Sequence, residues 1–127
     1  MRRFLLDSSF LIDLLCEEAD GRRGPAGAWL QRNPTAGLWI SPITLAEVLE
    51  GAADRAAVRT RLVRYRWQVI GHPHAERVAL RQGRSSQRMG ENDAWQVAVA
   101  EGLDAAILGH DPRAFERLGD GYVDHRA

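Results

Sequence analysis

Short apolar runs that alternate with helix-like segments are the feature that most constrains how this chain can fold. The runs cover residues 3–6, 38–41 and 105–108, and a weaker one lies at 122–123. Runs of this length are typical of buried strands, whereas the segments between them have helical spacing. The alternation favours an α/β fold, in which helices cover both faces of a central, mostly parallel sheet of four to five short strands.

Length and composition agree with a single domain over residues 1–127. Hydrophobic residues make up 45% of the chain, which is enough for a compact interior. Between the strands, spacing predicts helices over 52–66 and 73–84, with a brief extended piece at 69–70. Asn92 or Asp93 is expected to cap the next helix, which runs to about Gly102.

Four acidic residues lie where these apolar runs stop. Asp7 directly follows the first run, and Asp111 comes shortly after the third. Glu47 lies in the helix-like segment after the second run, and Asp93 opens the helix that leads into the third. Ligands of open α/β sheets bind beyond the carboxyl ends of the strands, so we expect the four acids to converge there.

A length argument supports this for the last two acids. A helix from Asp93 to Gly102 rises about 15 Å at 1.5 Å per residue, and a return strand from Ala105 to Gly109 recovers about 16 Å at 3.3 Å per residue. Asp111 is therefore expected to return to the level of Asp93.

A cluster of four carboxylates implies a compensating cation, because like charges raise one another's pKa. A hard divalent ion such as Mg²⁺ takes oxygen ligands and is the usual remedy. Each acid also has a purely structural explanation. Asp7 and Asp93 could cap helices, Asp111 could serve the turn before Pro112, and Glu47 could be a solvated helix residue. Ser9, near Asp7, could cap a helix or place a hydroxyl near a metal.

The basic residues exclude several kinds of phosphate chemistry. All 17 are arginines, and the chain has no lysine. A P-loop needs a lysine, and haloacid-dehalogenase-type phosphatases, response-regulator receivers and the common restriction-type nuclease core also place one beside their acids. The net charge is zero, so any nucleic-acid surface must be local rather than general.

Two groups of arginines are candidates for such a surface. The first is more simply explained as the solvated face of a helix. The second group precedes Asp93 in a polar segment, and its side chains could contact either phosphate or water. The first group is Arg55, Arg59, Arg61, Arg64 and Arg66, and the second is Arg81, Arg84 and Arg88.

A cytoplasmic location is expected. Cys16 is the only cysteine, which excludes an internal disulfide and suits a reducing compartment. No apolar stretch approaches the roughly 20 residues of a membrane span. Asp7 and Asp13 interrupt an N-terminal segment that otherwise starts like a signal peptide.

Four motifs that contain these acids resemble those of PIN-domain ribonucleases and, in size, VapC-like toxins of toxin–antitoxin pairs. The motifs occur in the same order as in that family, and together they span nearly the whole chain. They are Phe4 to Asp13, Ser41 to Gly51, Asn92 to Trp95, and Gly109 to Asp111 with Phe115.

The resemblance implies a three-layer PIN-like fold and an endoribonuclease that depends on Mg²⁺ or Mn²⁺. Asp7 and Asp93 would ligate the primary ion, and Glu47 would ligate it directly or through a water. Asp111 would hold a second ion or the water shell of the first. Metal-activated water would cleave RNA and leave a 5′-phosphate.

The family also implies three partners, which are an RNA substrate, a small antitoxin protein and a second copy in a homodimer. No association with a membrane is expected. Two other functions stay open: a PIN-fold RNA-binding or regulatory protein with little turnover, and a housekeeping RNA-processing nuclease.

The sequence departs from the family pattern at a few positions. Gly109 stands where the family often has serine or threonine, so a hydroxyl that supports the site is expected to be missing. Gln96 stands where an isoleucine-like residue is usual, and Ala114 replaces an acid before Phe115. Gly102 falls slightly earlier than the usual helix-ending glycine.

Overall fold

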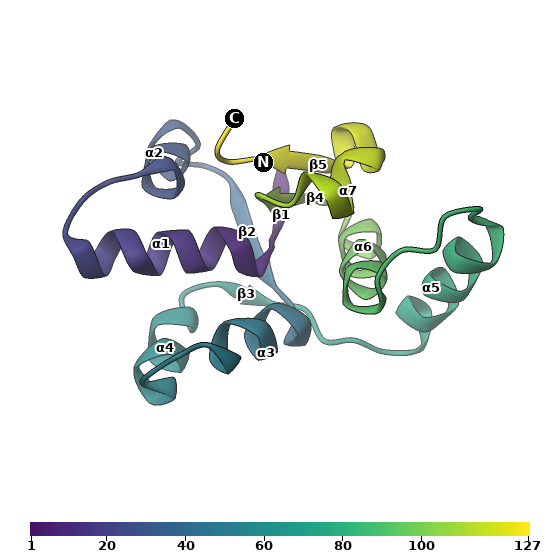
Figure 1. The fold of residues 1–127 in the computed structure, drawn as a ribbon, viewed down its shortest axis with the longest axis horizontal. Coiled ribbons are helices and arrows are strands. Elements are labelled where there is room, and N and C mark those ends of the chain that lie inside the picture. Colours follow the sequence, from purple (N-terminus) through teal and green to yellow (C-terminus); the bar gives the residue numbers. More distant parts are fainter.

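The computed structural model describes residues 1–127 and is built around a five-stranded parallel sheet (Figure 1). The strand order across the sheet is β3-β2-β1-β4-β5, and every neighbouring pair is parallel. The predicted α/β class and the predicted number of strands are therefore confirmed. The strands are β1 (Arg3–Leu6), β2 (Gly37–Ile40), β3 (Arg66–Trp67), β4 (Ala106–Gly109) and β5 (Tyr122–Asp124).

Helices cover both faces of the sheet, as predicted. The first four pack on one face and the last three on the other, with a short 3₁₀ helix before the final strand. No helix is both long enough and apolar enough to cross a membrane. The helices are α1 (Ser8–Asp20), α2 (Pro25–Arg32), α3 (Pro42–Glu50), α4 (Arg55–Leu62), α5 (His72–Arg84), α6 (Glu91–Leu103), α7 (Pro112–Phe115) and η1 (Glu116–Gly121).

The sheet separates two hydrophobic cores, because successive side chains of a strand point to opposite faces. In β1, Phe4 and Leu6 belong to the core under α1 to α4, whereas Leu5 belongs to the core under α5 to α7. In β4, Leu108 and Ile107 divide in the same way. Burial on both faces explains why these strands are continuous apolar runs in the sequence.

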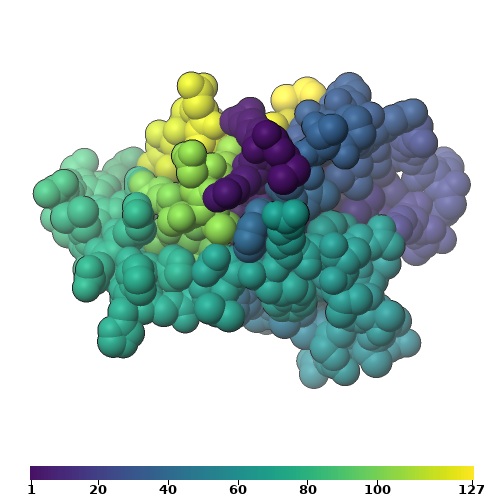
Figure 2. All heavy atoms as spheres, turned by 180° about the vertical axis from the view of Figure 1, so that it is seen from behind, coloured from purple at the N-terminus to yellow at the C-terminus, as the bar shows by residue number.

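The strand register makes the carboxyl ends of the central strands level. Leu6 pairs with Leu108 across β1 and β4, and the amide of Asp7 donates to the carbonyl of Leu108 at 2.9 Å. The chain therefore leaves these two strands at the same edge of the sheet. At the opposite end, the N-terminal residues lie between the blue segment before β2 and the green segment before β4 (Figure 2).

The segment after α3 differs from the prediction. A helix over 52–66 and an extended piece at 69–70 were expected, but α4 covers only Arg55–Leu62 and the strand is Arg66–Trp67. Asp54 starts the helix late, since its side chain accepts a hydrogen bond from the amide of Ala57. The helix ends at Leu62, and the chain then pairs as β3 with the open edge of β2. This edge pairing is non-local, so helical spacing does not reveal it.

Candidate carboxylate site

Asp7 lies where β1 ends and α1 begins, and it is both a helix cap and a site residue. Its carboxylate accepts hydrogen bonds from the amide of Ser9 at 3.2 Å and from the Ser9 hydroxyl at 2.6 Å. The side chain is buried, and this burial raises its pKa against the opposing effect of the Ser9 hydrogen bonds. The charge of Asp111 raises the pKa of Asp7 further, so these two acids lie near one another.

Glu47 reaches the same edge of the sheet from α3. This helix starts there because Ser41 caps it and Pro42 occupies its first position. Burial raises the pKa of Glu47, and the charge of Asp7 raises it further. The side chains of Ser8 and Asn92 favour its ionised form and oppose this rise.

Asp93 lies in the first turn of α6, rather than at its cap. The expectation that Asn92 or Asp93 would cap this helix is wrong, because α6 begins at Glu91 with Gly90 as the N-cap. The Asp93 carboxylate folds back over Gly90, where an added Cβ would lie 3.1 Å from its Oδ2. Glycine leaves the room for this close approach.

The pKa of Asp93 is raised to about 6, and the causes connect all four acids. Burial contributes most, followed by the charges of Asp111, Asp7 and Glu47 in that order, while Arg117 lowers it. A group that titrates near neutrality beside like charges is typical of a functional site.

Asp111 caps the short helix α7, and its charge also raises the pKa of Asp7 and Asp93. Its Oδ1 accepts from the amide of Ala114 at 3.3 Å, and its own amide donates to the hydroxyl of Tyr122 at 3.0 Å. Asp111 therefore does serve the turn before Pro112, as its structural explanation predicts, and it also belongs to the group of acids. With Asp93 it lines a hollow of about 360 Å³.

The structure thus brings all four predicted acids together, since the pKa values of Asp7, Glu47 and Asp93 are each raised by the charge of at least one other member of the group. The four carboxylates do not surround a common point, however, because no group of three or more His, Cys, Asp or Glu side chains is arranged to hold a metal ion. The donors themselves suit a hard divalent cation, because they are anionic oxygens whose repulsion a cation would relieve.

Ser9 supplies the hydroxyl that was expected to be missing at Gly109. Its Oγ donates to Asp7 and accepts from the amide of His110 at 2.8 Å, and so joins the first motif to the last. A Cβ on Gly109 would lie 2.6 Å from this Oγ and 2.7 Å from the Cβ of Asp7. Only glycine fits here, because Ser9 already occupies the space. The ring of His110 pairs with Asp124 of β5 instead.

Sequence reasoning missed three buried polar side chains that hydrogen bonds link in series, which we call the polar chain. The Ser41 hydroxyl donates to Oε1 of Gln96, and the Gln96 amide donates to Thr44 Oγ1 at 2.7 Å. Thr44 in turn donates to the carbonyl of Leu6 at 2.8 Å. All three side chains are buried, and they join α3, α6 and the end of β1. The available signal was a glutamine among the apolar residues of α6.

Comparison with known proteins assigns the chain to a family. The sequence matches the PIN domain family over residues 4–121, so the chain belongs to this family of nucleases. No curated protein matches it. The resemblance that the four motifs carried is confirmed.

Solved structures share this architecture over nearly the whole chain. A chain of a toxin–antitoxin complex from Klebsiella pneumoniae is 25% identical with a TM-score of 0.77, and the match covers 95% of this chain and 96% of that one. DNA-bound VapBC from Salmonella typhimurium gives 20% identity and a TM-score of 0.75, covering 98% and 99%. VapBC-1 from nontypeable Haemophilus influenzae gives 22% identity and a TM-score of 0.69, covering 98% of this chain and 99% of that one. The last two similarities show the fold.

Replacing Gly109 with alanine is expected to destabilise the protein and displace Asp7. The new Cβ would collide with Ser9 and Asp7, and strain of this kind costs about 1–3 kcal/mol. Gly83→Ala is the matched control. It lies in α5 with open space around it, and should gain about 0.5–1 kcal/mol. Thermal unfolding measures both, and equal melting temperatures for wild type and Gly109→Ala would contradict the close packing.

Gln96→Leu is expected to lower the free energy of unfolding by about 1–3 kcal/mol, because it leaves buried hydroxyls without their partner. Gln87→Leu is the control, since that exposed side chain makes no hydrogen bond and its replacement should stay within about 0.5 kcal/mol. Denaturant titration provides the measurement. An unchanged midpoint for Gln96→Leu would show that the polar chain does not hold these elements.

The pKa of Asp93 predicts a pH dependence in metal-free protein. A carboxyl whose pKa is higher when folded binds its proton more tightly in that state, so its contribution to stability is full below about pH 4 and is lost as the pH rises through about 6. Asp93→Asn should therefore be more stable than wild type at pH 7.5. Since solvent screens this half-exposed group, we expect about 1 kcal/mol, shrinking towards pH 5.

Melting temperatures in EDTA between pH 5 and 8 test this expectation. Glu76→Gln, on the exposed face of α5, is the control and should follow wild type at each pH. If Asp93→Asn also runs parallel to wild type over this range, its carboxylate is not under repulsion.

Proposed function

We propose that this protein is a metal-dependent endoribonuclease and the toxin of a toxin–antitoxin pair. One observation carries the catalytic part: acids from four separate segments gather at the carboxyl edge of the sheet, where their charges raise the pKa of Asp7, Glu47 and Asp93. A fold that needed these residues only as caps would have no reason to gather their charges.

The metal would be Mg²⁺ or Mn²⁺. Asp7 and Asp93 would hold the primary ion, Glu47 would act directly or through a water, and Asp111 would hold a second ion or the water shell. Mg²⁺ usually keeps several waters and takes only one or two carboxylates, which suits acids that are not closed around one point. Such an ion lowers the pKa of bound water and offsets charge that develops on phosphate oxygens.

The residues of the chain fix the geometry for this chemistry. The two hydrogen bonds from Ser9 hold the Asp7 carboxylate in one orientation. Ser8 and Asn92 favour the ionised form of Glu47, which a metal ligand or water-orienting base requires. The chain of Ser41, Gln96 and Thr44 keeps α3 and α6 in register with the end of β1. An in-line attack would leave a 5′-phosphate.

The biological role rests on similarity. The structural relatives above come from complexes of a toxin with its antitoxin, which supports a small antitoxin partner for this chain. We further propose that residues 1–127 act as a single domain, form a homodimer and work in the cytoplasm on RNA.

One observation favours a second function. Because no three of the acids are arranged around a common point, a PIN-fold RNA-binding or regulatory protein with little turnover would have this same structure. The two functions differ in metal binding and in cleavage.

Titration with Mn²⁺ and Mg²⁺ by calorimetry, together with cleavage of total cellular RNA, tests the proposal. Wild type should bind the ion and cut RNA. Asp7→Asn should lose about 100-fold or more of the cleavage rate, since even outer-shell partners of a metal are worth 10–100-fold. Glu76→Gln, an exposed acid outside the cluster, is the control and should cut like wild type.

Each outcome separates the alternatives. Binding of RNA without cleavage, in a sample that binds metal, would favour the regulatory function. A folded wild type that binds neither ion would remove the enzyme proposal.

A further inference from the structure

We propose that a groove beside the carboxylate site binds the phosphate backbone of a single-stranded RNA segment that extends away from the cleavage point. This inference rests on the proposed function and names how the substrate is held. The groove has a volume of about 340 Å³ and lies between α5, the segment that follows it to Met89, the last turn of α6 and η1. We call it the arginine groove and define it by Arg77, Arg81 and Arg84 of α5 and Arg117 of η1.

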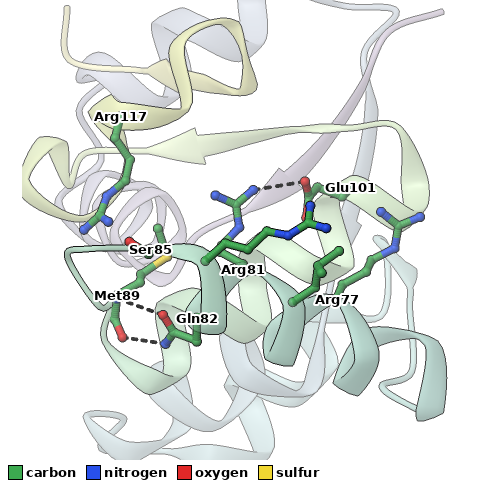
Figure 3. Close-up of a pocket in the computed structure, with 9 residues that line it drawn as sticks. Arg77, Arg81, Gln82, Ser85, Met89, Glu101 and Arg117 are labelled. Carbon is green, nitrogen blue, oxygen red and sulfur yellow. Dashed lines mark hydrogen bonds and ion pairs between the residues drawn. The ribbon is translucent and has the colours of Figure 1, made fainter.

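The helical spacing of α5 builds one wall of the arginine groove. Arg77, Arg81 and Arg84 are four and three residues apart, so they share one face of the helix. Figure 3 shows Arg77 at one end of the groove and Arg117 at the other. The floor is fixed, because Gln82 makes two hydrogen bonds to the backbone of the buried Met89, at 2.8 and 3.0 Å.

The charge of the groove is strongly positive and mostly unpaired. Glu101 is the only acid in its lining, and it pairs with Arg81 at 3.0 Å. Arg77 and Arg84 make no hydrogen bond or ion pair, and Arg117 bonds only to the carbonyl of Gln87. Since the whole chain has no net charge, three arginines without an acidic partner are a local concentration.

The arginine groove is continuous with the carboxylate site. Met89 and Arg117 line both the groove and the hollow that contains Asp93 and Asp111. Arg117 is also close enough to Asp93 to lower its pKa. A polyanion whose scissile phosphate lies over the acids could therefore continue directly along α5.

The dimensions and the lining favour an RNA backbone over an acidic peptide or a single phosphate. From Arg77 to Arg84 the helix rises about 10 Å at 1.5 Å per residue. Since about 3.4 Å per nucleotide is the rise within a stacked duplex strand, an extended single strand would place at most about three nucleotides along this length. Guanidinium groups bind phosphate through paired hydrogen bonds. Positive grooves that follow the backbone are how proteins hold single strands.

The groove contains no feature that reads bases. Its only apolar members are Leu80 and Met89, so it offers no aromatic ring for stacking. Contacts to phosphate position a nucleic acid without reading its sequence. The arginine groove would thus add affinity equally for all sequences, and selectivity would have to come from elsewhere.

The two arginine groups of the sequence are therefore not equivalent. Arg88 of the second group pairs with Glu91 and does not line the groove, whereas Arg77 and Arg117 were missed. In the first group, Arg61 is paired with Glu18. Only the folded chain distinguishes these positions.

Binding of a fluorescein-labelled, mixed-sequence 12-nucleotide RNA tests the proposal. Fluorescence anisotropy would be measured with Mg²⁺ in an Asp93→Asn background, so that the RNA is not cut, from about 50 to 300 mM salt. The double variant Arg77→Gln/Arg84→Gln should bind about 10-fold more weakly. Its slope of log K against log salt should fall by about 1.4, or 0.7 for each lost phosphate contact.

Two matched variants sharpen the result. Arg55→Gln/Arg59→Gln removes the same charge from the exposed surface of α4 and should leave affinity and slope unchanged. Glu101→Gln frees Arg81 and removes the only acid of the groove, so it should tighten RNA binding by several-fold. Circular dichroism confirms that each variant is folded.

Failure of this inference can be told apart from failure of the proposed function. If wild type cuts RNA but the α5 and α4 double variants bind it equally, the arginine groove is not the RNA track. If the α5 variant loses affinity only for a 12-residue polyglutamate probe and keeps it for RNA, the groove is a peptide site and the inference is overturned. Absence of cleavage by wild type contradicts the nuclease proposal instead.

Discussion

Repulsion among four carboxylates at one edge of the sheet is the constraint on which the rest of this structure depends. The parallel register makes the ends of β1 and β4 level, and the turns after them deliver Asp7 and Asp111 to the same place. Helices α3 and α6 add Glu47 and Asp93. Burial then makes the clustered charge more costly, which is why the pKa of Asp93 reaches about 6.

The surrounding residues offset this cost without removing it. Ser9 stabilises one carboxylate by hydrogen bonds, and Arg117 lowers the pKa of another. Below the acids, the polar chain through Gln96 resists separation of the helices that carry them. Holding like charges together in this way lowers stability, as functional sites commonly do, and the proposed cation would relieve the repulsion.

The charges of the molecule are segregated, although their sum is zero. Acids gather beyond the carboxyl ends of the strands, and the arginine groove begins where they end, with Arg117 in contact with both regions. An acidic centre alone would repel a polyanion. A cation at the acids and guanidinium groups along α5 would together give an RNA strand a continuous attractive path.

The sequence by itself determined the α/β class, the strands at both ends of the chain and the four acids, because buried parallel strands are continuous apolar runs and their ends are marked by capping residues. It did not determine β3, whose pairing with the edge of β2 is non-local, or the cap of α6, since Gly90 carries no capping side chain. Only the tertiary structure decided the partners across the chain: Gln96 with Ser41 and Thr44, Ser9 in the space beside Gly109, and Arg117 with the arginines of α5. These contacts join residues far apart in sequence, and local spacing carries no information about such pairs.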